Sequence, residues 1–232
     1  MALNRLKRAT LPRDIRAELS RAIVSGDLPA GSALSEPALA AKLGVSRAPI
    51  REALIELELR GMVVFDARGH TRVPTLTPAD LQEILDVRTA VDPLAASLAA
   101  RHGSTLCFDT LDANIVATAK AATLAEVSHL DTQFHAAIVQ AAGNRRLQMC
   151  WNVLENQVEL WLTQMQVHRE SMNHDTRDRT VAGHRDLLEA IRSGDSARAE
   201  AEARRHLASW VGLLPSFQSD ADAGTACKAR DA

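Results

Sequence analysis

The sequence predicts a mainly α-helical protein of two domains, and three observations lead to this prediction. Aromatic residues make up only 3% of the 232 residues and Tyr is absent, whereas β-sandwiches depend on aromatic and β-branched residues. Apolar residues recur at helical spacing along most of the chain. Strand-like runs are confined to residues 62–65 and 71–73, and none follows residue 75. The chain is long enough for two domains that each bury a core.

Residues 1–75 are expected to form one small domain of three helices and a hairpin. The predicted helices cover residues 11–26, 35–43 and 47–60, and a glycine lies at or just after the end of each. The two strand-like runs are separated by a polar stretch that contains Gly69, which is typical of a hairpin loop. Helix, helix, tight turn, helix and hairpin, in this order, form a winged helix-turn-helix.

Thr77, Pro78 and Asp80 mark the start of a second domain. Thr77 is a good helix N-cap, Pro78 suits the first helical position, and Asp80 lies near the positive end of the helix. Six helices are expected to follow, over residues 78–101, 105–120, 123–142, 144–170, 173–193 and 195–214. We therefore expect an all-α six-helix bundle over residues 78–214 and a disordered polar tail over 215–232.

The net charge of −2 hides an asymmetry between the two domains. Residues 1–75 carry 12 Lys and Arg against 8 Asp and Glu, whereas the remainder carries 15 against 21. A basic first domain joined to an acidic second one predicts that only the first meets a polyanion. The excess of positive charge in residues 1–75 is small, so the placement of the arginines decides whether this domain is expected to bind a polyanion.

Nothing in the composition indicates export or insertion into a membrane. The N-terminal residues lack the apolar core of a secretory signal, and no run of about 18 apolar residues is present. The three cysteines, Cys107, Cys150 and Cys227, are widely spaced and odd in number, which argues against a disulfide framework and a thiolate zinc site. We therefore expect a cytoplasmic protein with no membrane partner.

The third predicted helix presents hydrogen-bond donors near its start. Ser46, Arg47 and Arg51 lie there, and the two arginines are four residues apart, on one face. Arginine is the commonest reader of guanine in the major groove, where such a contact contributes about 1–3 kcal/mol of discrimination. The alternative is a solvated face on which the arginines pair with Glu52 or Glu58, but the surrounding order of elements favours DNA.

The predicted hairpin offers a second point of approach to DNA. Its loop contains Arg68, Gly69 and His70, and Gly69 keeps the loop compact. A basic wing tip of this kind can contact the phosphate backbone or the minor groove.

Together these residues closely resemble the DNA-binding domain of the GntR family over residues 11–75. The matching features are the LPAG turn at 28–31, the Ser-Glu-x-x-Leu-Ala pattern at 35–40, the Gly-Val-Ser-Arg-x-Pro-Ile-Arg-Glu-Ala-Leu run at 44–54 and the wing glycine. The resemblance implies that Arg47 and Arg51 read bases. It further implies that phosphates or the minor groove are contacted by Ser46, Arg68 and Gly69.

One position departs from the family pattern. Where the family usually has arginine after Ser-Glu, this chain has Pro37. A DNA contact from the second helix is therefore missing, which we expect to alter the operator sequence or to weaken affinity.

Four residues of the second domain form a candidate metal site. Asp131 and His135 are one helical turn apart and share a face. His184 lies ten residues before Gly194 and His206 twelve after it, or about 15 and 18 Å along two helices. In an antiparallel hairpin the two imidazoles lie at similar heights and can converge with the other pair. Such ligands suit Zn, Ni, Mn or Fe, although each histidine could instead be a hydrogen-bonded core or surface residue.

Arg88 falls within the apolar stripe of the first helix of the second domain. A buried arginine needs an anionic partner. That partner is either the carboxylate of a bound effector or an internal acid, for which Glu155 and Glu159 are the candidates. The residues alone do not decide between them.

The second domain is similar to the FCD ligand-binding domain of FadR-type GntR regulators. The patterns that carry the similarity are Asp-x-x-Phe-His-x-x-Ile…Ala-x-Gly-Asn-x-x-Leu at 131–147 and Gly-His-x-x-Leu-x-x-Ala-Ile-x-x-Gly-Asp…Arg-x-His-Leu at 183–207. The metal-binding members of that family bind small carboxylates beside the metal and use one Asp and three His. The resemblance implies the same role for Asp131, His135, His184 and His206, with zinc as the first choice of metal.

The sequence thus favours a ligand-responsive transcriptional regulator, not an enzyme, that binds DNA as a homodimer. Two-fold symmetry implies a pseudo-palindromic operator, and the family resemblance favours repression. In this interpretation a small organic acid contacts the metal and Arg88 and changes operator affinity. One alternative is a metal-dependent hydrolase or hydratase built on the three-His, one-Asp site. Another is an architectural DNA-binding protein without an effector, whose histidines are only structural.

Overall fold

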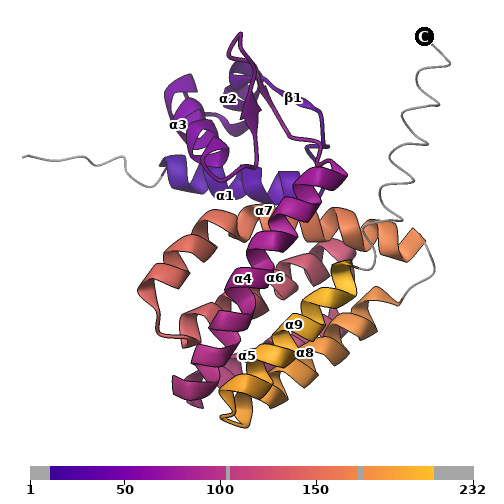
Figure 1. The fold of residues 1–232 in the computed structure, drawn as a ribbon. Coiled ribbons are helices and arrows are strands. Elements are labelled where there is room, and N and C mark those ends of the chain that lie inside the picture. Colours follow the sequence, from indigo (N-terminus) through magenta and orange to yellow (C-terminus); the bar gives the residue numbers. More distant parts are fainter. Residues whose placement is uncertain (1–10, 103–104, 172–174, 212–232) are drawn as a thin grey trace, which may run out of the picture. The chain divides into compact units, whose positions relative to one another are not determined.

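The computed structural model describes residues 11–102, 105–171 and 175–211, and the chain divides into two compact units, Met1–Thr75 and Leu76–Ala232. Figure 1 shows the first as a small mixed unit and the second as a bundle of helices. The tail expected over 215–232 lies outside the described residues.

The first unit combines three helices with a small antiparallel sheet. Its helices are α1 (Leu11–Val24), α2 (Glu36–Leu43) and α3 (Arg47–Glu58), and its strands are β1 (Ala33–Leu34), β2 (Val64–Phe65) and β3 (Thr71–Arg72). The strand order is β1-β3-β2, so the predicted hairpin carries a third strand on its other side. The sequence did not predict β1, because two residues are too short to display a strand period.

The core of the first unit lies between α1 and α3. Ile15, Leu19 and Ile23 recur at helical spacing on α1, and all three are buried. They face the partner helix, where Ile50 and Leu54 are fully buried. This apolar seam holds α3 in place, so that its opposite face is left to solvent.

The second unit consists of six helices in the described residues, as the sequence predicted. They are α4 (Pro78–His102), α5 (Thr105–Lys120), α6 (Leu124–Ala141), α7 (Arg145–Ser171), α8 (Thr176–Arg192) and α9 (Ser196–Val211). The start that was expected for the fifth of these helices, at 173, lies outside the described residues, and the described part of α8 begins at Thr176. The side chain of Asp175 accepts a hydrogen bond from the backbone N–H of Asp178 and caps the helix there.

Pro93 lies inside α4 and ties that helix to α9. Proline has no N–H, so the carbonyl of Thr89 loses its helical donor. Arg204 of α9 donates to this carbonyl at 3.4 Å and also pairs with Glu200. The two helices pack along each other, and α9 carries one of the predicted metal ligands close to this contact.

The core of the bundle is apolar apart from one polar region. Phe134, Trp151 and Trp161 are among its largest fully buried side chains. Within the described part of the chain, no helix combines the length and apolar character that are needed to cross a membrane. Against this apolar core, the buried polar region contains charged and histidine side chains, among them Arg88, Asp92 and Asp131.

Leu54→Ala is expected to destabilise the first unit by about 2–5 kcal/mol, because it opens a cavity at a fully buried site. Leu59→Ala is the matched control, since that side chain is 74% exposed and should cost less than about 0.5 kcal/mol. Denaturant unfolding of the full chain, followed by circular dichroism, measures both. Equal losses in the two variants would show that the α1–α3 seam is not the core of this unit.

Candidate functional site

The N-terminus of α3 is exposed and positioned by a tight turn. Gly44 ends α2 in the left-handed conformation with φ of 67°, which a glycine adopts at little cost. Ser46 then occupies the N-cap position in an extended conformation, but its hydroxyl makes no capping hydrogen bond. That hydroxyl is free to donate elsewhere.

Arg47 and Arg51 are exposed on α3, one turn apart. Neither guanidinium forms an ion pair with any residue in the described part of the chain, so pairing with Glu52 or Glu58 is not seen. The remaining acid of this helix, Glu56, pairs with Arg16 of α1. Two exposed arginines that make no ion pair among the described residues can donate to base edges from the start of this helix.

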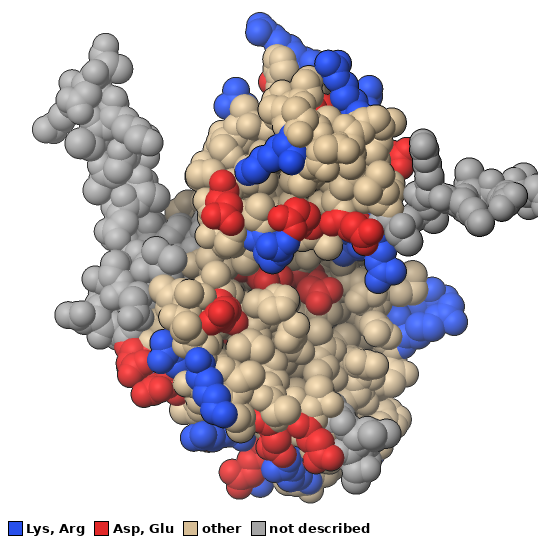
Figure 2. Space-filling view, turned by 180° about the vertical axis from the view of Figure 1, so that it is seen from behind, with Lys and Arg blue, Asp and Glu red and all other residues tan. Residues whose placement is uncertain are grey.

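The wing turn between β2 and β3 is organised by Asp66. Its carboxylate accepts hydrogen bonds from the backbone N–H groups of Arg68 and His70, at 2.8 and 2.9 Å. The N–H of His70 is the main reason why the pKa of Asp66 lies below its ordinary value. Gly69 has φ of 80° at the tip, and the side chain of Arg68 is exposed. Figure 2 shows basic side chains gathered at one end of the first unit.

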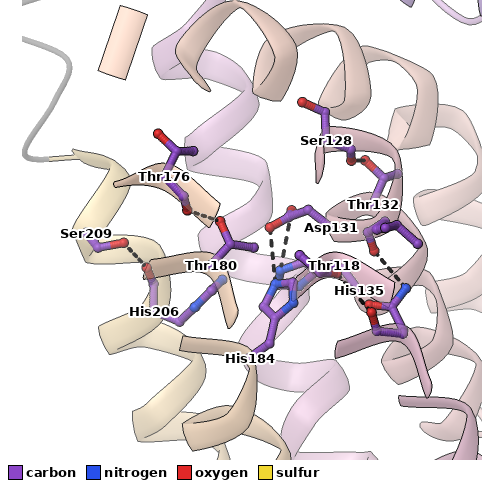
Figure 3. Close-up of polar contacts among 12 residues, drawn as sticks. Thr118, Ser128, Asp131, Thr132, His135, Thr176, Thr180, His184, His206 and Ser209 are labelled. Atoms are coloured by element: carbon purple, nitrogen blue, oxygen red, sulfur yellow. Dashed lines mark hydrogen bonds and ion pairs between the residues drawn. The ribbon is translucent and has the colours of Figure 1, made fainter. Parts of the chain in front are cut away.

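The second unit brings Asp131, His135, His184 and His206 together. The first two come from α6, the third from α8 and the fourth from α9, and all four are buried (Figure 3). One ligand atom of each lies within 4.8 Å of those of the other three. The close approach of α8 and α9 depends on Gly183, where a Cβ atom would lie 2.8 Å from Nδ1 of His206.

The donor atoms of this cluster fit a metal ion. His184 Nε2 lies 3.1 Å from Asp131 Oδ1, and His135 Nε2 lies 3.9 Å from Asp131 Oδ2. Each residue also has one buried polar atom that finds no hydrogen-bond partner among the described residues: Asp131 Oδ2, His135 Nε2, His184 Nδ1 and His206 Nε2. Buried unpaired atoms are costly unless something binds them. Nitrogen and carboxylate donors at this spacing suit a divalent transition metal.

Burial also favours the protonation states in which the cluster can bind a cation. It lowers the pKa of His184 and of His206, because the surroundings disfavour the charged imidazolium. Burial opposes ionisation of Asp131, but the hydrogen bond with His184 outweighs it, together with nearby charges that include that of Arg88, and the pKa of Asp131 is lowered. At neutral pH these two imidazoles are therefore neutral beside a carboxylate, which is the state that a metal ion requires.

Arg88 is fully buried, and its partner in this structure is Asp92, one turn further along α4. Its Nη2 and Nε atoms donate to Asp92 Oδ2 at 2.8 and 3.1 Å. The same oxygen lies 3.2 Å from His135 Nδ1. Of the acids considered from the sequence, Glu159 instead pairs with His129. Asp92 thus joins Arg88 to a member of the Asp/His cluster.

Sequence reasoning missed Asp92, although a signal for it existed. It lies four residues after Arg88 on the same helix, which is the usual spacing of a helical ion pair. A carboxylate that contacts the second nitrogen of a metal-binding histidine fixes the orientation of the ring. Asp92 Oδ2 has this relation to His135, whose other nitrogen faces Asp131.

Comparison with protein-family models matches both units of the chain. Residues 11–73 match the model described as bacterial regulatory proteins, gntR family, and residues 83–209 match the FCD domain. The second match alone spans more than half of the chain.

Curated relatives are transcriptional regulators. The chain is 29% identical to the probable D-xylose utilization operon transcriptional repressor of Paenarthrobacter nicotinovorans, over 89% of this chain and 90% of that protein. It is 28% identical to the gluconate operon transcriptional repressor of Bacillus subtilis, over 83% and 80%.

Solved structures share the fold. Escherichia coli McbR/YncC superposes with a TM-score of 0.73 at 18% identity, over 89% of this chain and 97% of that one. A putative GntR transcriptional regulator from Rhodococcus superposes with a TM-score of 0.71 at 20% identity, over 88% and 97%.

These matches confirm the predicted fold and the predicted class of protein. The metal-dependent hydrolase or hydratase considered from the sequence is wrong, because the family and the names of its members are those of DNA-binding regulators. The chain is a transcriptional regulator that belongs to the GntR family, in the FadR-type branch that carries an FCD domain.

Proposed function

We propose that this regulator is a ligand-responsive repressor that holds a divalent transition-metal ion. The observation that carries the proposal is the combination of two exposed arginines on α3, which form no ion pair with any described residue, and a buried Asp/His cluster in the second unit. The arginines supply contacts to an operator, and the cluster supplies a place to sense a small molecule. Repression is supported by the names of the two relatives described above.

The operator is read by α3 and contacted again by the wing. Arg47 and Arg51 donate to base edges in the major groove. Ser46, Arg68 and Gly69 contact phosphates or the minor groove. The uncapped Ser46 hydroxyl and the exposed wing tip support this assignment.

The protein acts as a homodimer on a pseudo-palindromic operator. Two copies related by a two-fold axis place their recognition helices in successive major grooves, so the half-sites repeat with inverted symmetry. Pro37, in the first turn of α2, offers no donor to DNA. We expect the half-site to lack a base contact there.

The metal ion is held by the four residues of the cluster, Asp131, His135, His184 and His206. Zinc is the first choice, because histidine nitrogens and a carboxylate are among its usual ligands; nickel, manganese and iron bind similar donors. When bound, the ion supplies further coordination positions at which a carboxylate oxygen can bind. The unpaired buried atoms of the cluster support this assignment.

The effector is a small organic acid that binds beside the cluster and reaches Arg88. The Nη1 atom of Arg88 is buried and has no hydrogen-bond partner, while the rest of the guanidinium is held by Asp92. A carboxylate is the natural acceptor for such a donor. A regulator that senses a small metabolite is in keeping with relatives named for D-xylose utilisation and gluconate operons.

Effector binding reaches the operator through α4. The chain leaves the first unit at Thr75 and enters α4 at Pro78, so the two units are joined by a very short segment. Arg88 and Asp92 lie on this same helix. In this proposal α4 has two positions, and the effector binds more tightly to the protein in one of them. Its binding shifts α4 toward that position, which changes the spacing of the paired DNA-binding domains and thereby lowers operator affinity.

Arg47→Ala and Arg51→Ala are each expected to weaken specific operator binding by about five- to 150-fold, because each removes a base contact of about 1–3 kcal/mol. Fluorescence anisotropy with the promoter duplex and a scrambled duplex measures the loss. Arg179→Ala, which changes an exposed arginine of the second unit, serves as the control and should bind normally. Undiminished specific binding by the Arg47/Arg51 double variant would refute the proposed reading helix.

Protein purified without an affinity tag is expected to contain about one metal ion per chain by elemental analysis. His184→Ala should lose it, and Asp92→Asn should weaken metal affinity about 10- to 100-fold, because His135 loses its orienting carboxylate. His102→Ala changes an exposed histidine and should leave the metal content unchanged. Absence of metal from the unmodified protein, with normal stability of His184→Ala, would instead support the architectural DNA-binding alternative.

Arg88→Lys is expected to reduce the response to a carboxylate effector at least tenfold. Lysine keeps a positive charge for Asp92 but loses the planar fork that binds two acceptors at once. Release of the operator duplex is measured while the organic acid is titrated, and binding without the acid should be unchanged. If the lysine variant responds at the same concentration as the unmodified protein, Arg88 is a structural ion pair and not an effector contact.

A further inference from the structure

The outward face of α4 is apolar over more than three helical turns. Figure 1 shows this helix along the front of the second unit, beside α9, and its opposite face is buried in the core. Seven residues lie within an arc of about 100° on the outward face. We call them the α4 stripe, and they are Glu83, Val87, Ala90, Val91, Leu94, Leu98 and Arg101.

Between its two charged ends the α4 stripe presents only apolar side chains to solvent. Val87 is 42% exposed and Leu94 is 46% exposed, although both are large and apolar. A helix on the surface of a monomer normally turns polar and charged residues outward. Contiguous exposed apolar residues instead mark a surface that another molecule covers.

The spacing along the stripe is that of a helix that packs lengthwise against another helix. Its four larger apolar residues follow one another at steps of four, three and four positions: Val87, Val91, Leu94 and Leu98. This is the repeat of two helices that cross at a shallow angle of about 20°. The small side chain of Ala90 lies among them and lets a second helix approach closely.

The two ends of the stripe carry opposite charges. Glu83 and Arg101 are eighteen residues apart, which is five whole helical turns, so they lie on one line along α4, about 27 Å from each other. Both side chains are exposed, and neither forms an ion pair with a described residue. The stripe is therefore an apolar surface with a negative charge at one end and a positive charge at the other.

This order of charges is complementary to a second copy of the same stripe. If two α4 helices run antiparallel about a two-fold axis level with position 92, each Glu83 meets the Arg101 of the other copy. In a parallel pair, like charges face each other at both ends, which is unfavourable. A surface that is complementary to itself in this way is typical of two-fold dimers.

We infer that the α4 stripe is the surface through which two copies of this chain pair, with their α4 helices antiparallel. The inference rests on the homodimer of the proposed function and names the surface that forms it. The starts of the two α4 helices then lie about 42 Å apart along the pair, so the DNA-binding units are attached at its opposite ends. This separation is comparable with the roughly 34–36 Å between half-sites one turn apart on DNA.

Leu94→Arg tests the surface itself. Because Leu94 lies near the two-fold axis, the variant places two like charges close together in an apolar contact. The dissociation constant of the dimer, measured by analytical ultracentrifugation of the full-length chain, is expected to rise about 100-fold or more. Val153→Arg is the matched control, since Val153 is 53% exposed but lies on α7, outside the stripe, and this variant should dimerise normally.

An exchange of charges tests the orientation of the pair. Glu83→Arg and Arg101→Glu should each raise the dissociation constant about tenfold, because each replaces two attractive contacts with two like-charge contacts. The double variant carries the same charges in reverse order and should restore dimerisation to within about threefold of the unmodified protein. Both changes oppose the helix dipole, so a role of the charges in helix stability alone predicts that the double variant is the weakest dimer.

Crosslinking gives a second measurement that does not depend on dissociation. The chain's three cysteines are first replaced by serine, and they are Cys107, Cys150 and Cys227. In the antiparallel pair, Leu94→Cys then places its two thiols about 6 Å apart along the helices, whereas Val87→Cys separates them by about 15 Å. A short bismaleimide should link the first variant efficiently and the second poorly, whereas a parallel pair would link both equally.

The outcomes separate this inference from the homodimer on which it rests. If the unmodified protein is a monomer at concentrations that saturate the operator, the proposed homodimer itself fails. If it is a dimer that Leu94→Arg leaves intact, or that Val153→Arg disrupts equally, the inference is overturned while the homodimer stands. Equal linking of the Val87→Cys and Leu94→Cys variants overturns the antiparallel orientation.

Discussion

The ion pair of Arg88 with Asp92 is the interaction around which the buried polar groups of the second unit are arranged. Both groups are almost completely removed from water, which is costly for charges unless they are paired and fully hydrogen-bonded. Their pairing meets only part of that requirement, since one atom of each is left without a partner. An apolar pair of similar volume could give the bundle equal or greater stability. Stability alone therefore does not account for the pair, whereas the proposed effector site gives it a role.

The same interaction organises the Asp/His cluster. Asp92 uses one oxygen for both Arg88 and His135, so the position of an α6 imidazole is set by a carboxylate of α4. The pKa of Asp92 stays below its ordinary value: burial opposes its ionisation, but the charge of Arg88 and the contact with His135 outweigh that effect. A persistent carboxylate beside the ring favours the tautomer whose other nitrogen is free for a metal ion.

The sequence predicts the fold well, because helical spacing and capping residues are local signals. The convergence of the cluster was also predictable, since the spacing of Asp131 and His135 and the offsets of His184 and His206 from a turn are simple geometry. The role of Asp92 was not, because an ion pair within one helix acquires meaning only when a second helix brings an imidazole to it.

The position of this network in the chain gives the proposed effector a covalent route to the proposed recognition helix, α3. α4 carries Arg88 and Asp92, and its start follows the first unit almost directly. Pro93 removes one of its helical hydrogen bonds, and Arg204 of α9 takes over the freed carbonyl of Thr89. α9 also carries His206, two residues further on. Because tightly packed cores shift between discrete arrangements and do not deform continuously, the proposed effector would act by biasing the position of α4 as a whole.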